Sequence, residues 1–417
     1  MVRAIRDFWI SPTFQDYDLV NILFYSFVLC CGALTGSLVS VVVIGSVVYC
    51  SLHLMTGRLR WALPAPVRIV FFAFCGLFAA EAIAALINPS AIALNEVVEN
   101  LPLLGLAGLY SVTFVDRSRL LNAVEMSAMA APIVALNILL LFFSEGSRPA
   151  LAAGNANVLA LLAAILYVFN IGSAFRRKSR MSLASLAGAF AAACIVILTG
   201  TRAMWPVLLL TPFLGLLIFG SRRNILAGFL AVCLTVTLIA GLGLLMSSSI
   251  NARIAALEAD VAAISEGDRS RSIGMRIQIY EAGYALFMEK PIFGYGPGNE
   301  RSEIGAKTTE HGPKAVAFSH AHNAILNVAL RSGLLGVVAL LAVLFTPLFV
   351  ALKAKKDDVG WAGLYVLTSL LLVYLLSGTV GLALGHDIHD TVYITGISYG
   401  LYLVFGRIPP PAGDSRR

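Results

Sequence analysis

SHAHNAILNVALRSGLLGVVALLAVLFTPLFVAL, residues 319–352, joins two histidines to a long apolar run without an acidic residue. The part from Ser332 to Leu352 is long and apolar enough to cross a bilayer as a helix. Three of the six histidines, His311, His320 and His322, fall within twelve positions at or before its start. The stretch therefore indicates a membrane-spanning helix and a place where titratable side chains gather.

The composition extends this reading to the whole chain. Of 417 residues, 59% are hydrophobic and 13% are charged, and the mean hydropathy is +0.85. A soluble domain carries about 25% charged residues, so the composition predicts a chain whose solvent is largely lipid. All six cysteines lie in apolar stretches, which favours small buried hydrophobic side chains over disulfides.

Apolar windows predict an all-α integral membrane protein with about twelve transmembrane helices. They divide the chain into a bundle of nine spans (1–246), one large loop (247–322), three further spans (323–406) and a tail (407–417). Arg3 and Arg6 precede the first window, which we interpret as a retained span and not as a signal peptide. The predicted spans are 19–34, 37–55, 69–87, 100–115, 120–143, 156–174, 181–199, 203–220, 225–246, 332–352, 360–384 and 391–406.

Lysine and arginine residues are concentrated in every second loop between these windows. With the N-terminus in the cytoplasm, nineteen of the thirty fall on the cytoplasmic side, whereas the short external loops hold only Arg148 and Arg202. Both termini are therefore expected in the cytoplasm, and the loop 247–322 on the external face. The positive charge of the chain follows its topology, so it does not indicate a nucleic-acid partner.

The large loop contains two short amphipathic patterns and one break. Residues at helical spacing predict two helices, which we expect on the membrane surface or on the outer ends of the spans. PIFGYGPGN, residues 291–299, ends the second helix with its prolines and glycines. The two apolar stripes are Ile254, Leu257, Val261 and Ile264, and Ile277, Tyr280, Tyr284 and Phe287.

His322 is the first candidate for chemistry, because it lies where the large loop meets a span. A neutral imidazole there can accept a proton near neutral pH. The alternative is an interfacial histidine that anchors a helix end. Ten residues separate His322 from Gly333. On a helix, His320 would point in a different direction from His322, so the two need not act together.

Two arginines are candidates for binding an anion. Arg276 opens the second amphipathic helix, and Arg202 occupies the tight turn LTGTRAMW. The guanidinium presents a fork of donors that matches phosphate oxygens. The alternative for both is snorkelling toward lipid headgroups.

Other polar groups give weaker signals. GHDIHD, residues 385–390, offers two histidines and two aspartates to a divalent metal, but we favour a hydrogen-bonded polar cap on two helices. Glu81 and Glu125 lie within spans, which makes them candidates for function. The sequence has no GxxxxGK[ST] loop, so it does not support nucleotide hydrolysis.

Three segments together resemble the O-antigen ligase and polymerase superfamily of bacterial inner membranes. They are GTR (200–202), RIQIYEAGYALFMEKPIFGYGPGN (276–299) and HAHNAILNVALRSGLLG (320–336). A histidine, ten residues and a glycine form the hallmark of the ligases, and His322 to Gly333 matches it. Twelve spans with a large periplasmic loop between the ninth and tenth also match.

This resemblance implies glycosyl transfer at the periplasmic face of the bacterial inner membrane. A glycan would pass from undecaprenyl diphosphate to a sugar hydroxyl of lipid A-core, with inversion at the anomeric carbon and with no cofactor, metal or nucleotide. By resemblance, His322 is the general base, and Arg276 and Arg202 neutralise the diphosphate leaving group.

The resemblance extends less firmly to substrate binding, for which His320, Arg301 and Lys314 are the candidates. Two other functions stay open. One is an O-antigen polymerase, whose acceptor is a second lipid-linked glycan. The other is a transporter or flippase of lipid-linked glycans, although transporters place polar residues at mid-membrane and this chain concentrates them in the large loop.

Overall fold

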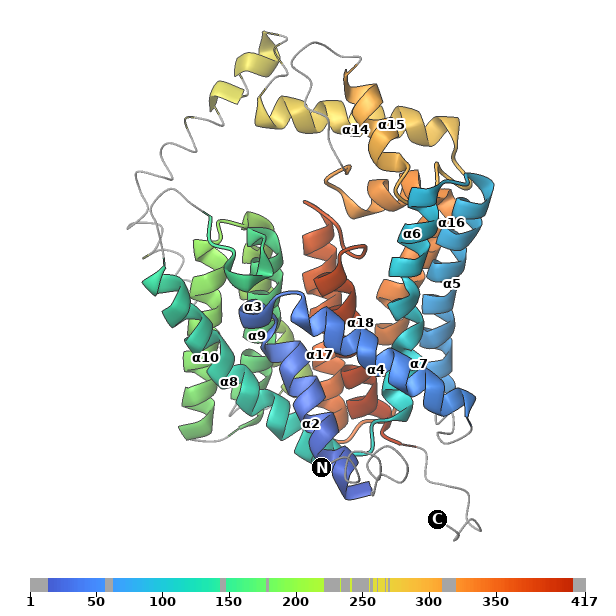
Figure 1. Ribbon diagram of the computed structural model, residues 1–417. Coiled ribbons are helices and arrows are strands. Elements are labelled where there is room, and N and C mark those ends of the chain that lie inside the picture. Colours follow the sequence, from blue (N-terminus) through green and yellow to red (C-terminus); the bar gives the residue numbers. More distant parts are fainter. Residues whose placement is uncertain are drawn as a thin grey trace.

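The computed structural model describes residues 14–56, 63–142, 148–177, 180–220, 271–309 and 320–407, with a few positions between 233 and 268. Over these residues the chain forms helices joined by turns, and no strand occurs among them (Figure 1). The helices are α2 (Phe14–Cys30), α3 (Gly32–Thr35), α4 (Leu38–Met55), α5 (Ala65–Ile87), α6 (Ala91–Glu99), η1 (Leu101–Gly105), α7 (Leu106–Ser111), α8 (Arg117–Leu141), η2 (Leu151–Ala153), α9 (Ala156–Arg176), α10 (Arg180–Leu198), η3 (Arg202–Met204), α11 (Trp205–Phe219), α14 (Ser272–Glu289), α15 (Glu300–Thr309), α16 (Ala324–Lys353), α17 (Asp358–Gly378) and α18 (Asp387–Phe405).

The chain is an all-helical multi-pass membrane protein. Within the described residues, nine helical stretches are long and apolar enough to cross a membrane. The predicted spans 19–34 and 391–406 coincide with α2 and α18, which are helical but are not among these nine. The predicted span 225–246 and most of the first amphipathic stripe lie outside the described residues. The count of twelve spans stays a prediction.

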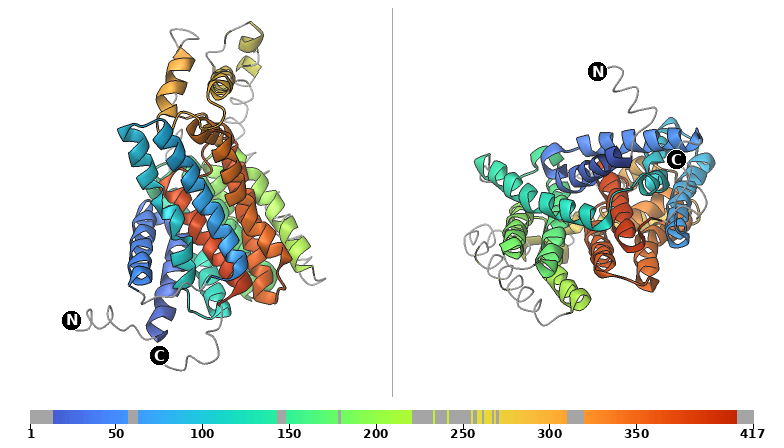
Figure 2. Two further views of the ribbon diagram at one scale, coloured as in Figure 1. Left: turned by 90° about the vertical axis from the view of Figure 1, so that its right-hand side faces the viewer. Right: turned by 90° about the horizontal axis from the view of Figure 1, so that it is seen from below.

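Helices α9 and α18 form the centre of the bundle. Every residue of α9 from Val158 to Phe175 is buried, because α8, α10, α11 and α17 surround this helix (Figures 1 and 2). Helix α18 packs against α17, α4, α2 and α7. A helix that is apolar on all sides must be covered by protein or by lipid, and α9 is covered by protein.

Short polar side chains fix where several of these helices begin. Asp116 accepts hydrogen bonds from the first amides of α8, Asn155 from α9, Asn323 from α16 and Asp357 from α17. Such caps satisfy backbone donors that have no partner within the helix. The starts of the apolar windows are therefore set by capping chemistry as well as by hydropathy.

Helices α14 and α15 and the segment 290–299 between them lie at one end of the bundle, and together we call them the cap. Helix α14 crosses over the spanning helices, while the start of α2 lies at the opposite end (Figure 1). Helix α14 packs against α15 and against α16. The cap is therefore attached to the bundle through α16.

The amphipathic helix predicted from residue 277 onward exists as α14. The buried face consists of Ile279, Ala282 and Leu286. Tyr280 and Tyr284, from the predicted stripe, are exposed. The spacing indicated a helix correctly, and residues outside the predicted stripe form the face that packs against protein.

Helix α16 breaks at the glycine of the histidine–glycine spacing. Ser332 and Gly333 have non-helical backbone angles, with φ of 65° at Gly333. A break of this kind frees backbone donors and acceptors, which must find other partners in a membrane protein. The cap supplies them, because residues 291–296 run alongside the break.

Backbone hydrogen bonds join the cap to both sides of the break. These bonds replace hydrogen bonds that the broken helix lacks. Moving either residues 291–296 or α16 would leave backbone N–H and C=O groups without partners. The Tyr295 amide donates to the Leu330 carbonyl (2.8 Å), the Gly296 amide to the Arg331 carbonyl (2.9 Å), and the Leu334 amide to the Pro291 carbonyl (2.8 Å).

The segment 291–296 and the break in α16 approach so closely that each requires a glycine. A Cβ atom on Gly333 would overlap the backbone of Ile292 and Phe293, and one on Gly294 would overlap the backbone of Leu330. Both glycines also have positive φ, which L-residues with a side chain rarely adopt. The packing therefore gives a physical reason for the glycine at this spacing from His322.

We predict that Gly333→Ala lowers the melting temperature of the purified protein. The backbone of Gly333, with φ of 65° and ψ of −159°, lies in a region used almost only by glycine, which costs about 1–3 kcal/mol for a residue with a Cβ, and the overlap with residues 292–293 adds to this. Gly76→Ala in α5 is the control, because its Cβ meets nothing within 4 Å. The control should leave the melting temperature unchanged or slightly raised. Equal melting temperatures for both variants would contradict the packing argument.

Candidate functional site

His320 and His322 lie next to each other, contrary to the expectation from helical spacing. Their ring centroids are 4.1 Å apart with the ring planes inclined by 54°. They precede α16 and so are not on a helix. The two imidazoles therefore form one titratable pair.

The backbone at His322 holds this arrangement. His322 has a φ of 49°, an uncommon conformation for a residue with a side chain. Directly after it, Asn323 caps α16 by accepting from the Leu326 amide at 3.1 Å. Strained residues of this kind persist where the surrounding structure fixes them, and they cluster at functional sites.

Arg276 lies close enough to His322 for its charge to act on the imidazole. Burial lowers the pKa of His322 below its usual value, and the Arg276 guanidinium lowers it further. A hydrogen bond with the backbone of Val380, in the turn after α17, acts in the opposite direction. His322 is therefore held neutral at pH 7, between α14 and the end of α17.

The charge of Arg301 acts on the His320 imidazole, as that of Arg276 acts on His322. Burial lowers the pKa of His320 to about 4, and the charges of His322 and Arg301 contribute. Arg301 is itself held by an ion pair with Glu96 of α6, at 2.8 Å. Four of the six predicted site residues thus lie in one cluster: Arg276, Arg301, His320 and His322.

Arg202 lies at the same end of the bundle. It opens η3, which packs against α17, and its side chain is exposed. The turn before it is fixed by Arg148, whose guanidinium donates to the Thr199 carbonyl at 2.9 Å and to the Thr201 hydroxyl at 3.0 Å. The two basic residues of the short loops thus work together: Arg148 holds the turn that presents Arg202. The sixth candidate, Lys314, lies outside the described residues.

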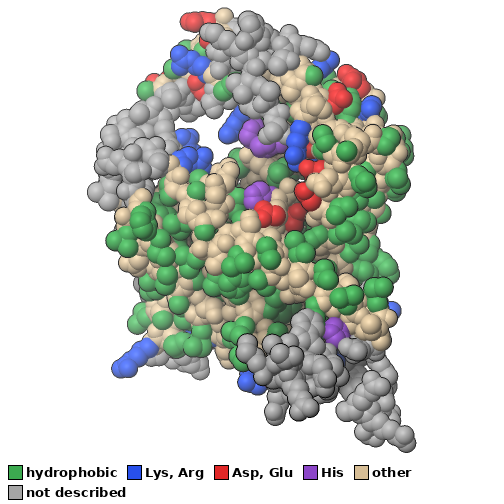
Figure 3. All heavy atoms as spheres, in the orientation of Figure 1, with side chains coloured by type: hydrophobic (Ala, Val, Ile, Leu, Met, Phe, Trp, Pro, Cys, Tyr) green, Lys and Arg blue, Asp and Glu red, His purple; other side chains and the backbone are tan. Residues whose placement is uncertain are grey.

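Figure 3 shows a hollow between the cap and the bundle, with histidine, basic and acidic side chains around it. The wider surface of the bundle is dominated by hydrophobic side chains in the same view. Polar and titratable groups are therefore concentrated below the cap.

Arg331, which the sequence reading did not single out, is the centre of a buried ion cluster. Its side chain is 5% exposed and contacts carboxylates of three different helices. Glu81 comes from α5 at 3.1 Å, Glu96 from α6 at 3.1 Å and Glu300 from α15 at 3.4 Å. Burial raises the pKa of Glu300, although Arg331 opposes this effect.

The cluster connects the spanning helices to the cap. Glu96 bridges Arg331 and Arg301, so the ion pairs continue from α5 to the arginine beside His320. A charge within an apolar run needs a partner. That rule could have flagged Arg331, but its partner Glu81 is 250 positions away in the sequence.

The other intramembrane carboxylate is also paired. The Glu125 carboxylate forms ion pairs with the guanidinium groups of Arg176 and Arg177, each with an N–O distance of 2.9 Å, where α8 lies beside the end of α9. This pairing accounts for the presence of Glu125 within a span. Glu125 lies on α8 beside the end of α9, whereas the turn that presents Arg202 contacts Asn157 at the start of α9, so the geometry does not bring Glu125 to the cluster.

The GHDIHD segment contains polar contacts within itself. Asp390 accepts from the Gly385 amide at 2.9 Å, and His386 pairs with Asp387 at 3.0 Å. Among the described residues, no group of three or more His, Cys, Asp or Glu side chains is arranged to hold a metal ion. These contacts order the turn that contains Val380.

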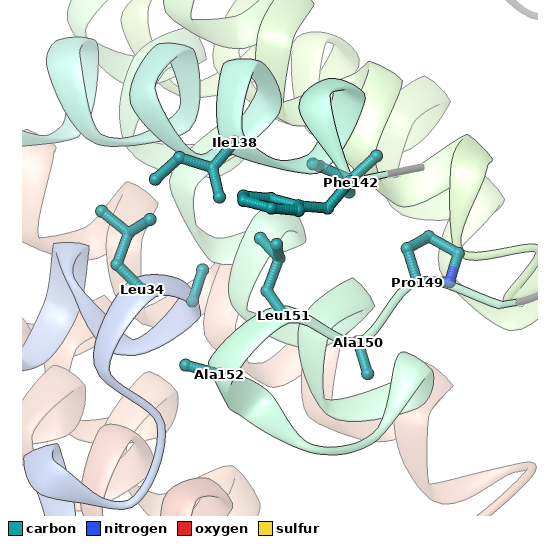
Figure 4. Close-up of a pocket in the computed structure, with 9 residues that line it drawn as sticks. Leu34, Ile138, Phe142, Pro149, Ala150, Leu151 and Ala152 are labelled. Atoms are coloured by element: carbon teal, nitrogen blue, oxygen red, sulfur yellow. The ribbon is translucent and has the colours of Figure 1, made fainter. Parts of the chain in front are cut away.

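A separate cavity of about 420 Å³ lies between α3, the end of α8 and η2 (Figure 4). Its lining is apolar and includes Leu34, Ile138, Phe142 and Leu151. It contains none of the predicted site residues. The chemistry of the chain is therefore concentrated below the cap and not in this cavity.

Residues 187–341 match the O-antigen ligase family. The matched range begins in α10 and ends in α16, so it contains both arginine candidates, both histidines, the cap and the break at Gly333. The resemblance of the sequence to this superfamily is confirmed.

A relative in another organism gives a broader but weaker match. An uncharacterized protein of Haemophilus influenzae is 25% identical over 250 residues, which cover 57% of this chain and 61% of that protein. The match thus spans less than two thirds of the relative. It carries no statement about activity.

We predict that Arg331→Met strongly destabilises the protein, because it leaves three carboxylates without their buried cation. Removing one partner of a buried ion pair costs about 3–5 kcal/mol. Arg119→Met is the control, because Arg119 is 65% exposed and pairs with Asp18 at the surface. The control should cost less than about 1 kcal/mol. Similar melting temperatures for the two variants would show that the cluster does not support the fold.

Proposed function

We propose that this chain is a glycosyltransferase that moves a glycan from undecaprenyl diphosphate to a sugar hydroxyl of lipid A-core. The observation that carries the proposal is the placement of His322, on a strained backbone, beside Arg276. The family match is consistent with an O-antigen ligase or polymerase and with lipid-linked glycans as substrates.

In this proposal His322 is the general base. Its lowered pKa keeps the imidazole neutral, so it can take the proton of the acceptor hydroxyl as that oxygen attacks the anomeric carbon. The bond to the diphosphate breaks on the opposite side, and the anomeric configuration inverts. His320 would bind substrate beside it, since the two rings are in contact.

Arg276 and Arg202 would stabilise the departing diphosphate. Negative charge accumulates on the leaving group, and preorganised cations at such a place contribute strongly to catalysis. Bound diphosphate would also offset the charge of Arg276 and so raise the pKa of His322. The base would then gain strength when the donor is present. Arg301 and Lys314 remain candidates for contacts with the substrate.

The orientation follows from the basic residues. We assign the cap to the periplasmic face of the bacterial inner membrane, and both termini to the cytoplasm. The ion pairs of Glu125 with Arg176 and Arg177 lie at the end of α9 away from the cap, as the excess of positive charge on the cytoplasmic side requires.

We predict that His322→Ala abolishes glycan transfer while the protein remains inserted and folded. Loss of a general base costs about 10²–10⁴ in rate. The assay offers purified protein an undecaprenyl-diphosphate glycan with lipid A-core as acceptor, and the His53→Ala variant serves as the control. His53 lies at the end of α4, outside the cluster.

The same assay separates the open alternatives. Attachment of glycan to lipid A-core supports the ligase, and elongation of a second lipid-linked glycan indicates the polymerase. Unchanged transfer by His322→Ala would remove His322 as the base. A wild-type protein that moves lipid-linked glycan across a bilayer without forming a glycosidic bond would be a transporter.

A second prediction concerns the pH dependence of transfer. Because neutral His322 is the active form, the rate falls as pH drops through its pKa. Arg276→Gln removes a cation that lowers this pKa, so the acid limb of the rate profile should move to higher pH. The maximal rate should also fall, by about 10²-fold.

Arg271→Gln is the matched control, since it removes an equal charge from the residue that precedes α14. It should leave the acid limb in place. An equal movement of the limb in both variants, or none in Arg276→Gln, would argue against the charge interaction between Arg276 and His322.

A further inference from the structure

The exposed side of α14 carries a row of large side chains that the fold does not use. Tyr280, Tyr284 and Met288 are 36%, 63% and 58% exposed. Their spacing of four residues places them along one side of the helix. We call these three residues the ridge.

The packing of α14 does not involve the ridge. Ile279 and Leu286 belong to a buried cluster with Tyr295, Ile304 and Leu330, which attaches α14 to the rest of the cap and to α16. The apolar surface that α14 needs for its attachment is therefore already covered. The ridge is a second surface of the same helix.

The ridge is continuous with the candidate site. Arg276 precedes Tyr280 by one turn, so the two side chains lie on the same side of α14. The charge of Arg276 acts on His322. From Arg276 to Met288 the helix rises by roughly 18 Å. The row therefore begins at the reactive cluster and leads away from it over a length that exceeds a single sugar.

We propose that the ridge binds the saccharide chain of the lipid-linked donor as it leads away from the diphosphate. The inference rests on the proposed function, which places the diphosphate at Arg276. The faces of the tyrosine rings would stack on the C–H faces of pyranose rings, while their hydroxyls bond to sugar hydroxyls. Tyrosine offers this amphipathic contact at little cost in side-chain entropy.

A bilayer is the competing occupant, and the composition of α14 argues against it. A helix that lies in the membrane interface buries its wide apolar face in lipid, whereas α14 buries Ile279, Ala282 and Leu286 in protein. The exposed side also includes Glu281 beside the ridge. An amphipathic saccharide suits such a mixed surface better than hydrocarbon does.

The test compares two donors in the transfer assay with the full-length protein. One carries a single sugar on undecaprenyl diphosphate, and the other carries a chain of several repeat units. The double variant Tyr280→Ser/Tyr284→Ser should raise the KM for the long donor about tenfold and leave the KM for the single-sugar donor unchanged. Tyr280→Phe/Tyr284→Phe keeps both rings and should retain most of the affinity for the long donor.

The outcomes separate this proposal from the proposed function. If wild-type protein transfers from neither donor, the proposed function fails. If transfer occurs but the serine variant changes both donors equally or neither, the ridge does not bind the saccharide chain. In lipid nanodiscs, Tyr284→Trp should show no more quenching by brominated lipid than wild-type protein. Additional quenching would place the ridge in the bilayer and overturn the proposal.

Discussion

The arrangement of this protein depends on the backbone junction between the cap and the broken helix α16. A helix interrupted at Ser332 and Gly333 inside a membrane protein exposes polar backbone groups. Residues 291–296 satisfy them by hydrogen bonds on both sides of the break. Since α14 and α15 flank that segment, the junction also fixes the helix that carries Arg276. The break in a spanning helix and the placement of an arginine beside His322 are therefore one structural feature.

The ion cluster around Arg331 supports the same junction from the membrane side. The backbone carbonyl of Arg331 accepts the Gly296 amide, and its side chain joins α5, α6 and α15. Buried charges are costly unless fully paired, so the cluster allows little freedom in how these helices meet. Glu96 extends it to Arg301, the neighbour of His320. Ion pairs and backbone hydrogen bonds thus fix where the imidazole pair lies relative to the bundle.

Much of this was predictable from the sequence, for identifiable reasons. Apolar length gives the spanning helices because lipid leaves the backbone few alternatives. The spacing from His322 to Gly333 selected His322 as the candidate base, which stays a prediction, and the break in α16 gives a physical reason for the glycine. The resemblance of the sequence also directed attention to Arg276, whose charge lowers the pKa of that histidine.

Other features could not be read from one sequence. The contact between His320 and His322 depends on a positive φ at His322, which the residue type does not predict. The partners of Arg331 are distant along the chain, so local patterns cannot reveal them. On α14, periodicity found the helix, but it could not show that Ile279, Ala282 and Leu286, outside the stripe, would form the face buried against protein.

The central claim is that donor diphosphate binds between Arg276 and His322, below the cap. A structure determined with undecaprenyl diphosphate bound would test it most directly. The account predicts phosphate oxygens within hydrogen-bonding distance of the Arg276 guanidinium, with the His322 ring facing the carbon that would carry the glycan. A diphosphate bound away from Arg276, or at the end of the bundle opposite the cap, would contradict it.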